Sequence, residues 1–349
     1  MTATLEVVSP GALATIQDLG RAGWRRFGVP RCGALDIGWL RIANVLAGND
    51  EGAAAIEFFI AGPTLKALDE PVQLGFAGDF ALTLVRGNGE RTQLESWRSL
   101  TLMPGDTLRT GAPHTARVGY ISVGGLAVAA VLGSASTYTR AHLGGHGGRA
   151  LAAGDKLAAA VAFHPGTLPV ERLLREPPAV DRGPIRIVPG PQADHFDAAT
   201  LDAFFAADYQ VSAEADRMGL RLQGPALTHR ADKGAEIVSD ATVPGSIQVP
   251  GNGLPIVLLA DGQTAGGYPK IGTVISADLP RLAVASVGTR LRFEAVTVAQ
   301  AEALARARET EVRRLLAAIK PQLLDGDIDL NAIYAANLVS GMINAHESA

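Results

Sequence analysis

The densest group of potentially reactive side chains lies in a glycine-rich segment, DGQTAGGYPKIG, at residues 261–272. Its glycines free the backbone from the Cβ restriction and Pro269 fixes its own φ, so the segment predicts a shaped loop and excludes a helix. An apolar run at residues 254–260 precedes it and predicts a buried strand. A rigid strand that leads into a polar loop is a common way to position a site. The candidate catalytic residues of this loop are Asp261, Gln263, Thr264 and Tyr268.

Three other segments also concentrate polar groups among turns, at residues 15–36, 216–222 and 245–251. Together with the loop they would place carboxylates, guanidiniums, amides and hydroxyls at the ends of several strands, as a pocket for a polar substrate requires. From these three segments, Asp36 is a further catalytic candidate. The substrate-binding candidates are Arg21, Arg217, Arg221, Gln248 and Lys270.

Two of these arginines also have a purely structural interpretation. Asp18 could pair with Arg21, and Asp216 with Arg221, only to hold their loops in place. Taken singly, each pair favours that structural role. The coincidence of four polar segments favours a substrate site.

The elements that must position these groups are mostly strands. Forty glycines and twenty prolines separate short apolar runs, which is a β-rich pattern. Residues 164–183 mix prolines with charges and predict the connection between two β-domains. We therefore expect three parts, at residues 1–180, 181–300 and 301–349, the last of them helical.

Three helices are expected. Residues 35–48 carry apolar side chains at helical spacing and end at Gly48, which suits a left-handed cap, and Asp36 would lie in the first turn. A longer helix begins at Thr297, whose hydroxyl can form a capping box. A final amphipathic helix is expected at residues 333–342.

The composition argues against several classes of partner. The chain has 349 residues and is 47% hydrophobic, which is enough to bury a sizeable core. Its net charge is only −4 and no basic block occurs, so it lacks the electrostatic footprint of proteins that bind nucleic acid or an anionic membrane. No signal-peptide pattern and no bilayer-length apolar stretch occurs, so we expect a cytoplasmic protein.

Few motifs of metal or cofactor chemistry are present. Cys32 is the only cysteine, which excludes an intrachain disulfide and a cysteine-rich metal cage. The helix expected after it could lower the pKa of its thiol, although a lone cysteine there is more often only a small residue. His142 and His146 lie in a glycine loop without a nearby carboxylate, so we expect no metal site. The chain also lacks a phosphate-binding loop and a nucleophile elbow.

The polar segments carry a family resemblance. The stretches TIQDLGRAGWRRFGVPRCGALD, ADRMGLRL and GSIQVPGNGLPIVLLADGQTAGGYPKIG resemble, in this order, the biotin-dependent carboxyltransferase family. Within it they are similar to the group that forms one subunit of bacterial ATP-dependent 5-oxoprolinases, also called KipA or allophanate hydrolase subunit 2. The resemblance implies a mainly β fold with some α, made of two cyclophilin-like β-barrel subdomains plus C-terminal helices.

The resemblance also implies an activity that needs partners. Members of this group would hydrolyse 5-oxo-L-proline to L-glutamate with ATP, together with a KipI-like B subunit and an A subunit of the 5-oxoprolinase. ATP would be bound by the complex and not clearly by this chain, and biotin would not be attached here, because no methionine has an adjacent lysine. Two alternatives stay open: a carboxyltransferase-like subunit that acts on urea or another amide, and a regulatory antagonist of a kinase-inhibitor protein.

The candidate residues suit the implied reaction. A lactam carbonyl is a poor electrophile, so donors such as Gln263 and Thr264 would stabilise the developing oxyanion. An arginine fork suits the substrate carboxylate better than the flexible Lys270. The fork candidates are Arg217 and Arg221. The candidates for moving a proton are Asp261, Asp36 and Tyr268.

The chain departs from the family pattern at three positions. Val284 and Thr289 stand where relatives tend to carry glutamine and aspartate, and Cys32 stands where serine is usual. If that glutamine touches substrate, its loss changes what the site can bind.

Overall fold

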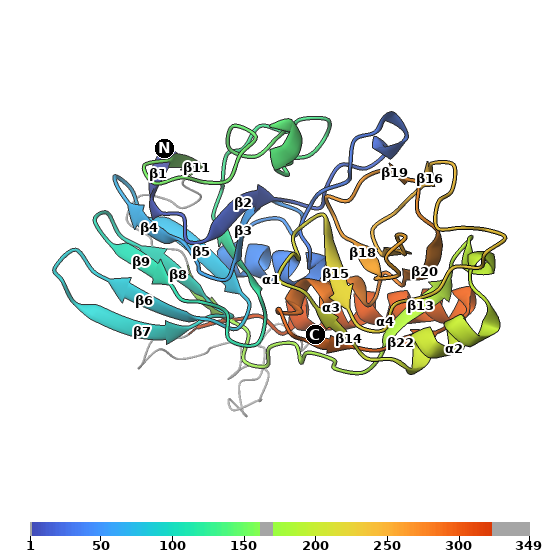
Figure 1. Ribbon diagram of the computed structural model, residues 1–349. Helices are drawn as coiled ribbons and strands as arrows, with labels where there is room; N and C mark the ends of the chain where they lie inside the picture. Colours follow the sequence, from blue (N-terminus) through green and yellow to red (C-terminus); the bar gives the residue numbers. More distant parts are fainter. Residues whose placement is uncertain (1, 161–169, 323–349) are drawn as a thin grey trace, which may run out of the picture.

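The computed structural model describes residues 2–160 and 170–322 and has two β-rich subdomains with α1 (Ile37–Ala47) between them (Figure 1). The predicted fold class, mainly β with some α, is confirmed. Within the described ranges, no helix has the length and apolar character needed to cross a bilayer. The helix expected at residues 333–342 lies outside the described residues.

The first subdomain has two antiparallel sheets with a shared apolar core, which includes Leu5 and Val7 of one sheet and Phe58 and Ile121 of the other. The first sheet contains, in spatial order, β11 (Lys156–Ala160), β1 (Thr2–Ser9), β4 (Thr64–Ala67), β9 (Thr107–Thr110), β6 (Ala81–Val85) and β7 (Arg91–Glu95). The second sheet contains β2 (Leu13–Gln17), β3 (Ala55–Phe59), β10 (Val118–Val123), β5 (Val72–Ala77) and β8 (Ser99–Leu102). Every residue of β3, β5 and β10 is buried, because one face of this sheet meets the first sheet while α1 packs on the other.

The second subdomain is built on one eight-stranded sheet that nearly closes into a barrel. In spatial order it contains β21 (Arg290–Leu291), β14 (Tyr209–Val211), β15 (Gly219–Gln223), β18 (Ile256–Leu258), β17 (Ser246–Gln248), β20 (Lys270–Val274), β13 (Ile185–Pro189) and β22 (Phe293–Ala295). The two edge strands, β21 and β22, are separated in sequence by Arg292 alone, which brings the ends of the sheet together. One short pair, β16 (Asp240–Ala241) with β19 (Ala265–Gly266), joins segments of this subdomain. A second pair, β12 (Arg172–Leu173) with β23 (Lys320–Pro321), lies against β8 of the first subdomain.

The helices follow their capping signals. Asp36 is the N-cap of α1 and accepts the Trp39 N–H, so it precedes the first turn instead of lying in it, while Gly48 closes the helix at φ 81°. Thr297 forms the expected capping box with Gln300 at the start of α4 (Val298–Ala317). The sequence analysis missed two short helices, α2 (Ala198–Ala206) and α3 (Leu279–Val284).

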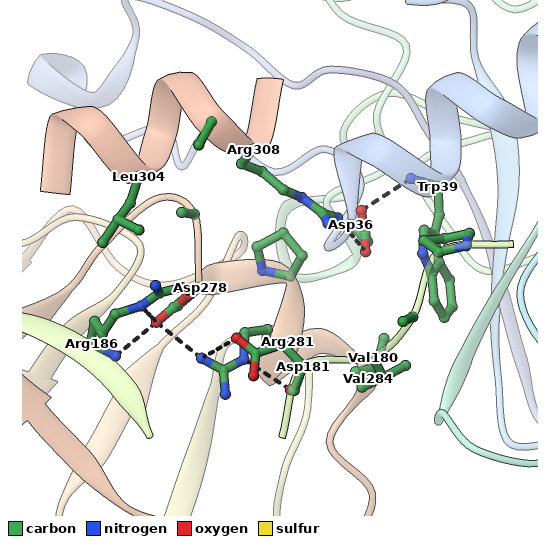
Figure 2. A pocket seen from close by; sticks show the side chains of 15 residues that line it. Asp36, Trp39, Val180, Asp181, Arg186, Asp278, Arg281, Val284, Leu304 and Arg308 are labelled. Atoms are coloured by element: carbon green, nitrogen blue, oxygen red, sulfur yellow. Dashed lines mark hydrogen bonds and ion pairs between the residues drawn. The ribbon is translucent and has the colours of Figure 1, made fainter. Parts of the chain in front are cut away.

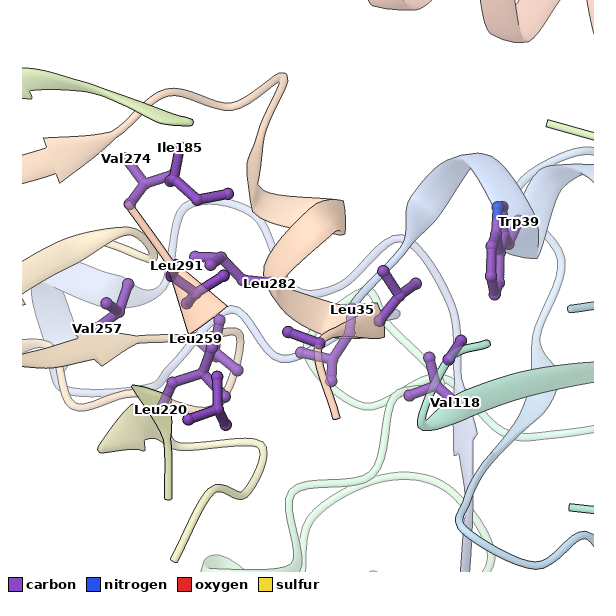
Figure 3. Packing of buried hydrophobic residues seen from close by; sticks show 14 of the residues in the cluster. Leu35, Trp39, Val118, Ile185, Leu220, Val257, Leu259, Val274, Leu282 and Leu291 are labelled. Carbon is purple, nitrogen blue, oxygen red and sulfur yellow. The ribbon is translucent and has the colours of Figure 1, made fainter. Parts of the chain in front are cut away.

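One apolar core joins the two subdomains. Leu35 lies between Val118 of the first subdomain and Leu282 of the second, and Trp39 belongs to the same cluster (Figure 3). Leu282 and Val118 are completely buried. Because burying such a side chain contributes about 1.5–3 kcal/mol, this shared core fixes how the subdomains sit against each other. Polar groups at the junction are therefore held by a packed framework.

Candidate functional site

The polar loop at residues 261–272 is held by a short ladder. The loop connects β18 to β20, and the short strand β19 within the loop pairs with β16. The Thr242 N–H donates to the Thr264 carbonyl at 3.0 Å, and the Ile237 N–H donates to the Gly267 carbonyl at 2.8 Å. The neighbouring segment thus fixes the shape of the loop through its backbone.

Close packing explains two of its glycines. A Cβ at Gly266 would lie 2.4 Å from Gln248 Nε2, and a Cβ at Gly272 would lie 2.5 Å from Ile187 Cδ1. None of the four glycines at residues 261–272 has a positive φ. Close approach to a neighbour, and not a left-handed turn, is what requires glycine at these two positions.

Arg25 of the first subdomain reaches into this loop. Its Nη2 donates to the Thr242 carbonyl at 2.6 Å and to the Gln263 carbonyl at 3.1 Å. The Gln263 Nε2 in turn donates to Gln248 Oε1 at 2.9 Å. Figure 1 shows η1 (Arg25–Phe27), in blue, next to β16 and β19. These contacts join the two subdomains through one line of polar side chains, Arg25, Gln263 and Gln248.

This line ends in two donors that have no protein partner. Gln248 Nε2 and Arg25 Nη1 are both buried and have no hydrogen bond to any residue that the structure describes. Gln248 is 2% exposed. Burial lowers the pKa of Arg25. A buried donor without an acceptor is costly, so the arrangement suits an acceptor brought by a ligand.

Arg217, in contrast, is saturated by the protein. Its Nε and Nη2 donate to the two oxygens of Asp261 at 3.0 and 2.8 Å, Nη1 pairs with Glu57, and Nη2 also donates to the Gly33 carbonyl at 2.7 Å. Burial opposes the charge, but Asp261 and Glu57 outweigh it and raise the pKa of Arg217. Two of its partners belong to the first subdomain, so Arg217 acts as an ionic clamp across the junction.

Glu57 is the fixed end of this clamp. It lies in the middle of β3 and is completely buried. Its Oε2 accepts the Tyr120 hydroxyl at 2.6 Å and the Leu35 N–H at 2.8 Å, while Oε1 faces Arg217. A buried carboxylate is tolerated only with such partners. The sequence held a signal for this role, because Glu57 is the single charge in the apolar run AIEFFI.

Cys32 lies beside the clamp. Its N–H donates to the Ala260 carbonyl at 2.9 Å, which places it next to Asp261. Burial, and then the Asp261 carboxylate, raise the pKa of the thiol to about 12. The interpretation that a helix N-terminus lowers this pKa is therefore wrong. Cys32 is a protonated, buried residue at neutral pH.

The expected ion pair between Asp18 and Arg21 does not form. Asp18 accepts hydrogen bonds from Ser134, Ser136 and the Ala135 N–H. Burial opposes its charge, but these hydrogen bonds outweigh burial and lower its pKa. Arg21 is 1% exposed and donates to the Val131 and Ser136 carbonyls instead. Both residues hold residues 131–136, and Arg21 Nη1 is a third buried donor without a partner in the described ranges.

Lys270 lies at the far end of the loop. Its ammonium group pairs with Asp240 Oδ2 at 2.7 Å although the side chain is 4% exposed. Gln192 bridges the pair, because its Nε2 donates to Asp240 at 3.1 Å and its Oε1 accepts the Lys270 N–H at 3.2 Å. The Lys270 hydrogen bond is the main cause of the lowered pKa of Asp240. Lys270 thus brings a positive charge to the edge of the loop.

The structure brings most, but not all, of the predicted residues together. The candidates in or against the loop are Asp261, Gln263, Thr264, Tyr268, Arg217, Gln248 and Lys270. Tyr268 is 40% exposed. Arg221 lies apart, on a surface cavity, and pairs with Glu214 at 3.1 Å instead of Asp216. Asp36 faces Arg308 of α4 and not the loop.

Sequence reasoning missed the long-range partners in this region. The missed residues are Arg25, Glu57, Gln192, Asp240 and Thr242. Of the two departures from the family pattern in this subdomain, Val284 ends α3 and is buried, whereas Thr289 lies in the turn before β21. Neither contacts the loop through a hydrogen bond.

The fold agrees with comparisons to known proteins. Residues 27–295 match the family model of the carboxyltransferase domain, subdomain A and B. The chain belongs to this family. Membership accounts for the two joined β-rich subdomains, since the match runs from η1 to the end of β22.

Individual relatives narrow the comparison. The chain is 38% identical over 298 residues to the 5-oxoprolinase C subunit of Escherichia coli (strain K12), covering 83% of this chain and 90% of the relative. It is 35% identical over 320 residues to the 5-oxoprolinase C subunit of Haemophilus influenzae, covering 89% and 98%. The crystal structure of the Kluyveromyces lactis urea carboxylase is similar, with a TM-score of 0.78 and 26% identity over 92% of this chain. This chain spans only 30% of that urea carboxylase.

Proposed function

We propose that this chain is the counterpart of the C subunit in a 5-oxoprolinase complex, which hydrolyses 5-oxo-L-proline to L-glutamate with ATP. Two relatives of that name support the proposal, since the chain covers 90% and 98% of their lengths. The observation that carries it within the structure is the polar line of Arg25, Gln263 and Gln248, which offers buried donors to an acceptor.

The donors suit the carbonyl oxygen of an amide. When a nucleophile attacks that carbonyl, negative charge develops on the oxygen, and donors held in place before the reaction stabilise it. Gln248 Nε2 and Arg25 Nη1 are the buried donors, and the Thr264 hydroxyl lies in the same loop. We assign the substrate carboxylate to the edge of the loop at Lys270, whose ammonium group would exchange part of its contact with the exposed Asp240 for the substrate.

The ionic clamp has a different role in this proposal. Arg217 and Asp261 use their hydrogen-bonding groups on each other, so we assign them to positioning the start of the loop. Tyr268, which is partly exposed, is then the group in the loop that can exchange a proton with substrate. This assignment replaces the expected contact between Arg217 and the substrate carboxylate.

The complex supplies what this chain does not. The sequence has no phosphate-binding loop, so we assign ATP to the KipI-like B subunit or to the A subunit. ATP bound there would supply the free energy that activates the amide carbonyl. We expect this chain alone to be inactive, and we expect the complex in the cytoplasm, where ATP is available. Biotin is not part of the proposed reaction on this chain.

Reconstitution tests the proposal directly. The chain is co-expressed with its candidate A and B partners, and release of L-glutamate from 5-oxo-L-proline is measured with and without ATP. We expect ATP-dependent turnover by the full set and none when any one chain is omitted. A stable complex that turns over no amide would contradict the proposal and favour the regulatory alternative.

A urea-type substrate is the second candidate, because the chain shares its fold with a urea carboxylase at 26% identity. The same reconstituted complex is therefore given urea and small amides. Turnover of these substrates without turnover of 5-oxo-L-proline would select the second candidate.

A further inference from the structure

A cavity of about 220 Å³ lies where α1, α3, α4 and the connection at residues 178–181 meet (Figure 2). None of the residues that line it belongs to the loop at residues 261–272. Its volume is below the range of roughly 300–1,000 Å³ that is typical of drug-sized ligands, so it suits a small metabolite. Its apolar wall includes Trp39, Val180, Val284, Leu304 and Pro280.

Most charges around this cavity are satisfied by the protein. Arg186 donates to Asp278 from Nε at 2.9 Å and from Nη2 at 2.5 Å. Arg281 contacts Asp278 at 3.2 Å and donates to the Pro184 carbonyl at 2.8 Å. Figure 2 shows this chain of charges along one side of the cavity. These two guanidinium groups have little capacity left for a ligand.

Arg308 and Asp36 differ from that cluster. Arg308 extends from α4 toward Asp36, and Nη2 lies 3.7 Å from Oδ2, which is too long for a hydrogen bond (Figure 2). Within the described residues, the Arg308 guanidinium donates no hydrogen bond. Asp36 Oδ1 accepts the Trp39 N–H at 3.0 Å and the Gly38 N–H also faces the carboxylate, whereas the nearest cation, Arg308, stays 3.7 Å from Oδ2. A cation and a carboxylate thus face the cavity with unused hydrogen-bonding capacity.

The long contact between Asp36 and Arg308 is unusual because Asp36 is buried. The residue is 2% exposed, and burial raises the pKa of its carboxyl group. A buried carboxylate is stable only when donors satisfy both of its oxygens. The protein supplies this carboxylate with backbone N–H groups and no short contact to a cation, so a ligand with a charged donor would add the partner that is missing.

We infer that this cavity binds a small acid that carries an N–H or ammonium group next to its carboxylate, as an amino acid does. The Arg308 fork would take the ligand carboxylate, and Asp36 Oδ2 would accept the N–H. The apolar wall would hold a short side chain or a ring. The long contact between Arg308 and Asp36 is thereby replaced by two short charge-assisted ones. This second site is separate from the loop and does not depend on which amide the complex hydrolyses.

Calorimetry or NMR titration of the full chain tests the inference with matched probes. L-proline and L-glutamate carry both groups, cyclopentanecarboxylate lacks the nitrogen, and pyrrolidine lacks the carboxylate. We expect at least one of the two amino acids to bind, and both single-group probes to bind at least about tenfold more weakly. Failure of both amino acids to bind at about 10 mM would overturn the inference.

Four variants locate the binding. Arg308→Gln and Asp36→Asn should each weaken it at least about tenfold, and asparagine still caps α1. Arg306→Gln is the matched control, because Arg306 is on the same helix and 71% exposed. Gln263→Ala, in the loop, should also bind normally. Unchanged affinity in Arg308→Gln and Asp36→Asn, or loss of binding in Gln263→Ala, would show that the ligand binds elsewhere and would contradict the inference. The melting temperature of each variant confirms that it is folded.

Discussion

Two arginines at the junction of the subdomains differ in what their guanidinium groups contact. Arg217 is 7% exposed and is surrounded by Asp261, Glu57 and the Gly33 carbonyl. Arg25 uses one nitrogen on two backbone carbonyls and leaves Nη1 buried without a protein acceptor in the described part of the chain. Both residues join the subdomains, but Arg25 has hydrogen-bonding capacity to spare and Arg217 does not.

This difference separates a residue that stabilises the junction, Arg217, from a residue that can bind a ligand, Arg25. A buried ion pair roughly offsets its own desolvation, so the value of Arg217 lies in the cost of breaking the pair. A buried donor without a partner costs stability in the free protein and is repaid only by a ligand. Arg217 should therefore affect folding more than turnover, and Arg25 should affect turnover more than folding.

The largest effect is expected at the clamp. Arg217→Met would leave Glu57 and Asp261 buried without a cation, and should lower the free energy of unfolding by about 3–5 kcal/mol. Chemical denaturation of the isolated chain measures it. Arg221→Met is the control, since that side chain is 57% exposed and should change stability by less than about 0.5 kcal/mol. Equal stability of the two variants would show that the ion pairs of Arg217 do not stabilise the fold.

Arg25→Met should act mainly on catalysis. The loss of its donors should reduce kcat/KM of the reconstituted complex by about 10²- to 10³-fold, as the loss of an oxyanion donor does. Arg26→Met is the matched control, because Arg26 is exposed and lies over the Phe27 ring at 4.8 Å. If Arg25→Met lowers stability but leaves the turnover of each folded molecule unchanged, Arg25 has a structural role like that of Arg217.

Smaller losses are expected within the loop. Gln263→Ala and Thr264→Ala should each cost about 1–3 kcal/mol of transition-state stabilisation with little change in melting temperature. Steady-state kinetics and thermal unfolding are measured on the same samples. Full specific activity in both variants would show that the loop is only scaffold.

The smallest effect concerns pH and the thiol packed beside the clamp. The folded-state pKa of Cys32 is about 12, against 9.0 for an ordinary thiol, so above pH 9 the unfolded chain loses a proton that the folded chain keeps. Stability should therefore fall as pH rises from 9 toward 12, by about 1.4 kcal/mol at pH 10. The free energy of unfolding of the wild type and of Cys32→Ser is measured at pH 8 and at pH 10. The difference between the two pH dependences is the contribution of Cys32, because all other groups are common to both proteins. Identical pH dependence in both proteins would contradict the raised pKa.

The sequence determined the elements whose signals are local. Gly48 marks the end of α1, and Thr297 with Gln300 marks the start of α4, as predicted, whereas Asp36 is the N-cap of α1 and was expected in its first turn. A cap depends on side chains within a few residues of a helix end, so its signal survives without knowledge of the fold. The same holds for the polar loop at residues 261–272, whose glycines and proline exclude regular helix whatever surrounds it.

Only the tertiary structure decided which charges meet. Arg21 and Arg221 were expected to pair with acids three and five residues away, yet one binds the carbonyls of residues 131 and 136 and the other binds Glu214. Arg217 reaches Glu57 across 160 residues of sequence, and Arg25 reaches Gln263 across 238. Such partners are chosen by how two packed subdomains meet, because the shared core fixes the junction and each buried charge must then find its partner there. Sequence spacing carries no information on that choice.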